Sequence, residues 1–298
     1  MNQPLRLLPQ RRDAEALILA LVVIGFLTAI LGSASAILLT GSRRLQYERS
    51  RMTSLWLARS GVELGLSRLP DPNRQFTSLS GEWATGEDTS GHRLSSGEFG
   101  LGLGMDAGDS DIRPISDAES RINVNAVPLS TLESALPGIQ ERTLTQIEER
   151  REKRQFITVR ELRGLLNSIQ TRELEQLFTV HGTGRLNVNT TTRRMLSCMP
   201  GVTDELAEAI IQRRRGPDGQ DGTEDDRPFR DKEALRSFFT DHNANWEEAE
   251  QWLTVRSSYF IIYGWGRSDT SQRTNRVLRA VADNNELPSR TIHRQEVH

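Results

Sequence analysis

The sequence lacks most of the residue patterns that mark an enzyme, a metalloprotein or a disulfide-stabilised domain. Its 298 residues include one cysteine, Cys198, which excludes an intrachain disulfide framework and a cysteine-based zinc site. The five histidines are scattered, and neither a Gly-x-Ser-x-Gly motif nor a phosphate-binding loop occurs. The net charge is only -2, so composition does not favour a nucleic-acid partner. These absences favour a protein that is not an enzyme, with a secreted hydrolase of unrecognised carboxylates as an alternative.

One long apolar run stands out against a polar average. The mean hydropathy of -0.51 excludes a polytopic membrane protein, yet residues 16–40 carry no charge. About 20 apolar helical residues cross a bilayer core. A signal peptide cut after Ala36 is the alternative, but the run stays apolar beyond that point. We therefore expect a retained transmembrane anchor.

The anchor continues into a second helical pattern, because no proline occurs between Pro9 and Pro70. The pattern predicts one unbroken helix over residues 15–69, half of it in lipid and half docked on a folded body. The docking face would consist of the apolar residues that recur at helical spacing: Leu45, Met52, Leu55, Val62, Leu66 and Leu69.

Strand patterns occur on both sides of the middle of the chain. Within residues 70–117, alternation with glycine predicts a strand whose buried face holds Phe99, Leu101, Leu103 and Met105. Within residues 246–283, a strand over 255–265 and a second over 274–282 form a predicted hairpin. We expect one antiparallel sheet packed on the N-terminal helix. The polar residues 284–298 are predicted to form a flexible tail.

The segment between these strands repeats itself. The first copy, residues 118–180, holds Arg121-Ile-Asn-Val-Asn125 and a later Pro137-Gly138, while the second, residues 181–245, holds Arg185-Leu-Asn-Val-Asn189 and Pro200-Gly201. An arginine follows the glycine at the same spacing in both copies. Each copy predicts helix, tight turn, helix, loop and helix, which is a helix-hairpin-helix or SAM-like unit.

Such hairpins often bind DNA phosphates through their turn amides. DNA-binding versions usually carry a second glycine two residues after the first, where this chain has Gln140 and Thr203. Acidic and basic residues also nearly balance in both copies, which disfavours phosphate binding. We expect packing modules and no nucleic acid, and keep a membrane-anchored DNA-binding receptor as the alternative function.

The second copy contains an acidic loop over residues 216–226. Its five acids lie close together in the sequence, separated by glycines: Asp218, Asp221, Glu224, Asp225 and Asp226. A flexible loop of this composition can supply the six to eight oxygen ligands of calcium, although the spacing is not that of an EF-hand. A calcium site and a solvated acidic turn both remain open.

Taken together, these features resemble the protein K family of the type II secretion system, the large minor pseudopilins. The most specific stretches are 121–139, 185–214 and 253–260. The resemblance implies an α+β fold: a long N-terminal transmembrane helix packed on a small antiparallel pilin-like sheet, with a large α-helical insertion of two SAM-like repeats. It also implies calcium sites in the helical domain.

The same resemblance implies location, partners and processing. The chain would span the inner membrane once, with its body in the periplasm. It would cap the tip of the pseudopilus together with minor pseudopilins I and J, help start the fibre, and contact secreted substrate or the secretin. Residues 1–14 would be a leader cleaved between Ala14 and Glu15, although the family usually has glycine at the position of Ala14. The fifth mature residue is then Leu19, in place of the usual pilin glutamate.

Overall fold

The computed structural model describes residues 10–85, 91–103, 113–166, 171–270 and 275–297, without the side chains of residues 10–14, 171 and 172. The chain divides into two compact units, Met1–Met52 and Thr53–His298. Helix α1 (Gln10–Ser67) has 58 residues and continues through this division, which confirms the prediction of one unbroken helix. It begins at Gln10, inside the leader predicted from the sequence.

In the first unit, α1 carries the apolar run. Every described side chain from Glu15 to Arg49 is exposed. An 18-residue window of the helix has a mean hydropathy of 2.6, and the helix is long and apolar enough to cross a membrane. This finding rests on length and composition and agrees with a single membrane anchor.

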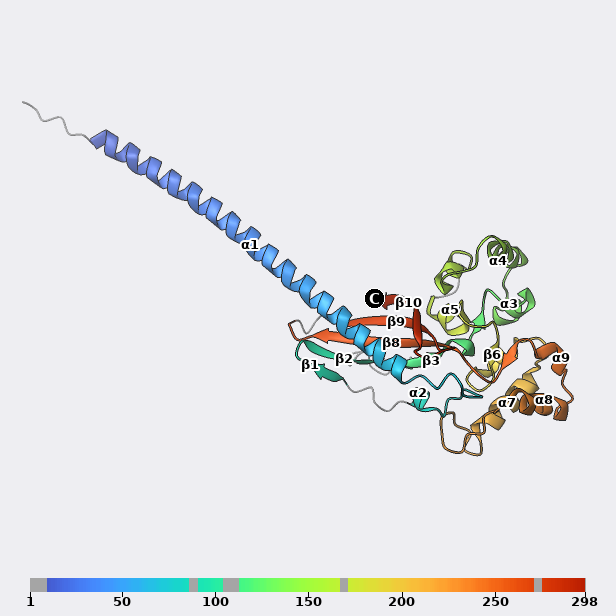
Figure 1. Ribbon diagram of the computed structural model, residues 1–298. Helices are drawn as coiled ribbons and strands as arrows, with labels where there is room; N and C mark the ends of the chain where they lie inside the picture. Colours follow the sequence, from blue (N-terminus) through green and yellow to red (C-terminus); the bar gives the residue numbers. More distant parts are fainter. Residues whose placement is uncertain (1–9, 86–90, 104–112, 167–170, 271–274, 298) are drawn as a thin grey trace, which may run out of the picture. The chain divides into compact units, whose positions relative to one another are not determined.

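The second unit contains an antiparallel sheet (Figure 1). Its described strands run in the order β1-β2-β8-β9-β10, and β3 pairs with the part of β8 that β2 leaves free. The strands are β1 (His92–Leu94), β2 (Gly97–Leu101), β3 (Ile115–Asp117), β8 (Tyr259–Ser268), β9 (Asn275–Asp283) and β10 (Arg290–Val297). A short helix, α2 (Glu82–Thr85), precedes β1.

The last turns of α1 pack on one face of this sheet at very close range. A Cβ on Gly264 would stand 2.5 Å from the backbone nitrogen of Val62, and one on Gly266 would come closer still to that of Ala58. Further along the same face, Phe260 and Ile262 form a core cluster with leucines of α1. The glycines of β8 therefore allow the helix backbone to touch the sheet.

The docking face of α1 differs from the predicted one. Leu45 and Met52 are exposed, at 63% and 53%, whereas Val62 is buried. The side of the helix that meets the sheet is made mainly of small residues: Ser54, Ala58, Gly61 and Gly65 are buried along with Leu57 and Val62. Hydrophobic spacing correctly placed Val62, Leu66 and Leu69 on this face. It missed the small residues, because close backbone contact selects them over large apolar ones.

The strands agree with the sequence in type and differ in extent. The predicted hairpin is β8 and β9, but β2 ends at Leu101, so that Leu103 lies beyond it, and Met105 lies outside the described residues. The predicted flexible tail is wrong, because residues 290–297 form β10 along β9. Backbone pairing and an ion pair of 3.1 Å between Arg276 and Glu296 hold this strand.

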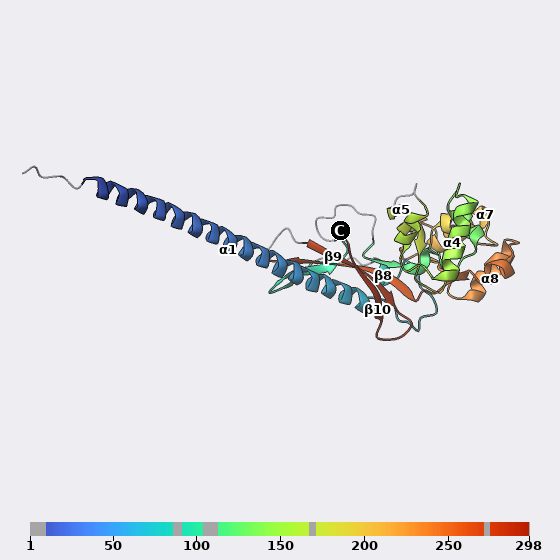
Figure 2. The ribbon, with the colours of Figure 1, turned by 90° about the horizontal axis from the view of Figure 1, so that it is seen from above.

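Between β3 and β8 the chain forms a helical insertion with its own core (Figure 2). A 3-10 turn, η1 (Ala118–Ser120), leads into the first copy: β4 (Ile122–Asn123), α3 (Leu129–Ala135), α4 (Glu141–Lys153), η2 (Val159–Gly164), α5 (Thr171–Leu177) and β5 (Phe178–Thr179). The second copy comprises β6 (Leu186–Asn187), α6 (Arg193–Leu196), α7 (Asp204–Arg215), α8 (Lys232–Asp241), α9 (Trp246–Ala249) and β7 (Leu253–Thr254).

Each copy closes on itself through a pair of parallel strands. Ile122 of β4 pairs with Phe178 of β5, and Leu186 of β6 pairs with Leu253 of β7. The duplication is therefore longer than the sequence showed. Residues 246–255, predicted to belong with the sheet, pack in the helical core.

Candidate functional site

The last asparagine of each Asn-x-Asn motif forms hydrogen bonds within its own copy. In the first copy, the side-chain amide of Asn125 donates to Phe156 O at 3.0 Å and its carbonyl accepts from Phe156 N at 2.8 Å. In the second copy, Asn189 makes the same two bonds to Phe229, at 2.9 and 2.8 Å. These asparagines thus satisfy buried backbone groups, which explains the repeat of the motif without a ligand.

Each copy also places one arginine of its second helix against the start of the copy. Arg151 Nη1 donates to Val127 O at 2.9 Å, and Arg214 Nη1 donates to Thr191 O at 2.6 Å. In the first copy, Nε and Nη2 of Arg151 are buried and have no hydrogen-bond partner within the described part of the chain. The two copies therefore differ in what neutralises this arginine.

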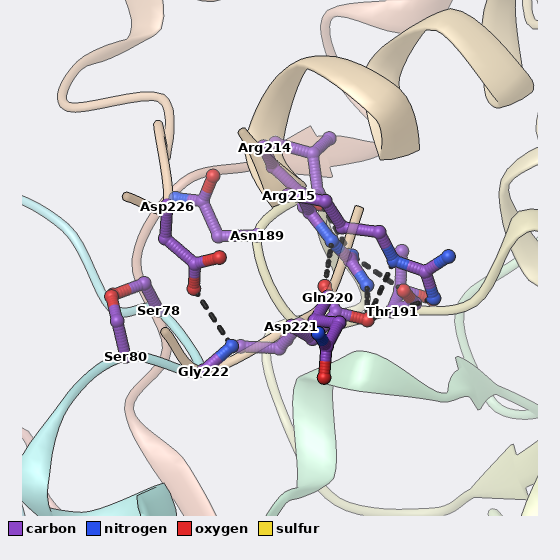
Figure 3. Close-up of polar contacts among 12 residues, drawn as sticks. Ser78, Ser80, Asn189, Thr191, Arg214, Arg215, Gln220, Asp221, Gly222 and Asp226 are labelled. Atoms are coloured by element: carbon purple, nitrogen blue, oxygen red, sulfur yellow. Dashed lines mark hydrogen bonds and ion pairs between the residues drawn. The ribbon is translucent and has the colours of Figure 1, made fainter. Parts of the chain in front are cut away.

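In the second copy, Asp221 of the acidic loop supplies the counter-charge (Figure 3). Its carboxylate accepts from Arg214 Nε at 2.9 Å and Arg214 Nη2 at 3.2 Å, and from Arg215 Nε at 3.0 Å. Burial acts to raise the pKa of Asp221, but hydrogen bonds from the two guanidinium groups lower it overall. The Arg214 side chain is only 5% exposed, so this pair fixes the acidic loop to the helical core.

The remaining acids of the loop accept mainly local hydrogen bonds. Asp225 accepts from the backbone nitrogen of Asp218 at 3.0 Å, Asp226 accepts from that of Gly222 at 2.8 Å, and Glu224 is exposed. No group of three acids, histidines or cysteines in the described residues is arranged to hold a metal. The five predicted calcium ligands are therefore not gathered into one site, because Asp221 is turned to the arginines.

The two Pro-Gly turns are alike in conformation and unlike in surroundings. Gly138 and Gly201 both have positive φ, 85° and 74°. A Cβ on Gly138 would meet open space, whereas one on Gly201 would lie 3.0 Å from Asn245 O and 3.1 Å from Ala249 N. The turn Pro200-Gly201 is thus covered by α9, which leaves less room for a DNA phosphate than an open hairpin would.

The predicted cleavage point lies inside α1. Ala14 belongs to the helix and its side chain is outside the described residues, whereas Glu15 is exposed. Residues 1–9 of the predicted leader also lie outside them.

Two buried acids at the root of the insertion were missed by the sequence analysis. Asp117 and Glu119 are each 2% exposed. Asp117 Oδ2 accepts from Ser257 Oγ and from Thr190 Oγ1, both at 2.5 Å, and Glu119 Oε2 accepts from Ser258 N at 2.7 Å. Burial and the nearby charge of Glu119 raise the pKa of Asp117 to about 6. The sequence does not distinguish these two buried acids from acids on the surface, because burial depends on the folded structure.

Comparison with known proteins gives a match among solved structures. No family model and no curated protein matches the sequence. A search of solved structures matches a chain of the crystal structure of the GspK–GspI–GspJ complex from the type 2 secretion system of enterotoxigenic Escherichia coli. The TM-score is 0.56 at 15% identity, and the match covers 87% of this chain and 99% of that one. The chain therefore has a GspK-like, pilin-like α+β fold.

Proposed function

We propose that this chain is a minor pseudopilin of a type II secretion system, a structural protein with no catalytic role. It would cap the periplasmic pseudopilus together with partners of the I and J type, and help start assembly of the fibre. The chain would be anchored once in the inner membrane, with its body in the periplasm. The leader, residues 1–14, would be removed between Ala14 and Glu15.

One observation carries this proposal. A single helix joins a fully exposed apolar segment to a sheet on which its last turns are packed. Such a helix can lie in lipid and later be buried among like helices of a fibre, because either environment removes the same apolar surface from water. The full-length coverage of the matched pseudopilin chain supports the same function.

The insertion suggests why this subunit would stand at a tip. A fibre of repeated subunits grows through head-to-tail contacts. The insertion leaves the sheet after Asp117 and returns just before Phe260, and these two residues pair in antiparallel register. It is therefore a large addition to a sheet whose strands β3 and β8 pair directly, and we propose that it blocks a further subunit.

The pairing of Asp117 with Phe260 allows the insertion to be removed cleanly. Replacing residues 118–259 with Asn-Gly would join β3 to β8 by a two-residue hairpin. We expect the shortened chain to enter the body of the fibre, so that quantitative mass spectrometry of sheared pseudopili finds more copies per fibre than for the full chain. An unchanged copy number, with the sheet shown to be intact by circular dichroism, would contradict the steric account.

The partner assignment is tested with the full chain in detergent. Co-purification with the I- and J-type pseudopilins of the same host is expected to give a stable complex of three chains. If no complex forms and the chain binds DNA in a salt-dependent way instead, the DNA-receptor alternative replaces this proposal. Contact with secreted substrate or the secretin is a further proposal, tested by crosslinking from the insertion.

Calcium stays a proposal for the acidic loop, with a smaller ligand set than the sequence predicted. Asp221 is bound to arginines, so the other four predicted ligands remain, with oxygens of the loop: Asp218, Glu224, Asp225 and Asp226. Burial raises the pKa of Asp226, and the nearby charges of Asp221 and Asp218 raise it further. A cation that drew these carboxylates together would relieve their mutual repulsion, and addition of a chelator tests this.

A further inference from the structure

Two histidines that lie far apart in the sequence meet in the fold. His181 follows β5, where the first copy meets the second, and His293 lies on β10 of the sheet. Their ring centroids are 5.8 Å apart, with the planes inclined by 35°. Arg279 of the neighbouring strand β9 stands close enough for its charge to act on both rings.

These three side chains surround a small cavity of about 20 Å³. A cavity needs about 10–15 Å³ to hold one water molecule, so this one admits a single water or an ion of similar size. Its walls also include Arg160 and Glu175.

The charges around the cavity do not balance. Arg160 from η2 is bound to Glu175 from α5 at 2.9 Å, so the one acid that lines the cavity is already paired. Arg279 has no acidic partner among the residues that the structure describes, and neither imidazole has one. The cavity thus holds one uncompensated guanidinium and two rings that can donate N–H bonds.

We propose that His181, His293 and Arg279 form a binding site for a monatomic anion, chloride in the first place. The guanidinium disfavours a metal cation, although two histidines alone would suit one. An anion in the cavity would receive charge-assisted hydrogen bonds from β9, from β10 and from the distant segment after β5. It would thereby link β9 and β10 to the end of the first copy.

The titration of the rings supports this assignment. Burial, then the charges of Arg279 and His293, lower the pKa of His181 to about 4, and burial and Arg279 also lower that of His293. An anion between these groups offsets that repulsion, so it binds more tightly when a ring is protonated. Chloride affinity should therefore rise as the pH falls.

The test uses the full chain in a non-ionic detergent at constant ionic strength. Sodium gluconate, whose anion cannot enter the cavity, is replaced stepwise by sodium chloride, and the thermal midpoint and the ³⁵Cl NMR linewidth are followed. We expect a saturable rise of the midpoint and broadening of the chloride signal, with several-fold tighter binding at pH 5 than at pH 8. Equal midpoints in the two salts would mean that only water fills the cavity, and would overturn the proposal.

Matched variants locate the effect. Arg279→Gln should abolish both the midpoint rise and the broadening, whereas Arg290→Gln, at an exposed arginine of β10, should leave both unchanged. His293→Asn gives a second reading if Arg279→Gln does not fold, and should weaken chloride and remove part of the pH dependence. A chloride effect that persists at full size in Arg279→Gln or His293→Asn would also refute the site.

Discussion

The contact between α1 and β8 gives the sharpest prediction, because backbone atoms meet there on both sides. In Gly264→Ala, the new Cβ would stand 2.5 Å from Val62 N, 2.6 Å from Ala58 O and 2.8 Å from Gly61 C. Ordinary contacts of a Cβ begin at 3.4 Å. No rotamer change can relieve a clash with three backbone atoms, so the helix must retreat by roughly 1 Å over these turns.

The expected cost follows from these distances. Overpacking costs about 1–3 kcal/mol, and the upper part of that range applies where backbone must move. Loss of glycine freedom in the unfolded chain returns about 0.4–1 kcal/mol. The net loss is about 2 kcal/mol, which lowers the thermal midpoint by about 4–8 °C for a body of this size.

Thermal unfolding of the full chain in detergent, followed by tryptophan fluorescence, measures this loss. Gly164→Ala is the matched control, since a Cβ there would meet nothing within 4 Å and its φ is not positive. If Gly264→Ala and Gly164→Ala shift the midpoint equally, the close contact between helix and sheet does not exist in solution and the reasoning fails.

Three further predictions concern charge. Between pH 4 and 6 the raised pKa of Asp117 makes the folded state bind a proton more tightly than the unfolded one, so its contribution to stability falls as the pH rises, by about 3 kcal/mol in all. The lowered pKa of His181 acts with the opposite sign. Stability measured by urea unfolding should therefore rise with pH over 4–6.5 in Asp117→Asn and fall over 4–6 in His181→Asn. Parallel pH profiles of the two variants would contradict both assignments. Asp221→Asn should cost about 2 kcal/mol, since Arg214 loses its counter-charge but keeps two carbonyl bonds, and a midpoint within about 1 °C of the parent would count against the ion pair. Addition of a chelator should lower the midpoint of the full chain but not of a variant with Asp218 replaced by Asn, and no change in either would remove calcium from the proposal.

The sequence predicted those parts of the fold that depend on local pattern. A proline-free apolar run predicted α1, and two alternating segments predicted β8 and β9. The repeated Asn-x-Asn and Pro-Gly stretches predicted a duplicated helical insertion. These features can be predicted from the sequence because the hydrophobic period and the residue preferences of turns act over a few residues.

The parts that were missed depend on contacts between distant segments. The small-residue face of α1 depends on the glycines of β8, which lie near the other end of the chain. Strand β10 forms because it pairs with β9, although its own sequence is polar. The sequence could not show that Asp221 pairs with Arg214 and does not bind calcium, because the two side chains meet only when the loop folds back on α7. The meeting of His181 with His293 has no sequence signal at all.

The adjacency of Asp117 and Phe260 also determines how a pulling force would travel through the body. Tension entering by the last turns of α1 reaches the strands of the sheet, and the hydrogen bonds between β3 and β8 bridge the two ends of the insertion. Part of the load therefore passes from β3 directly to β8. The rest can enter the insertion, because Thr77, in the segment after α1, accepts a hydrogen bond from Asn187 Nδ2 at 3.2 Å and donates one to Val255 O at 2.9 Å. A pull on α1 would therefore be carried by two routes, the β3–β8 pairing and the hydrogen bonds of Thr77 to the helical insertion.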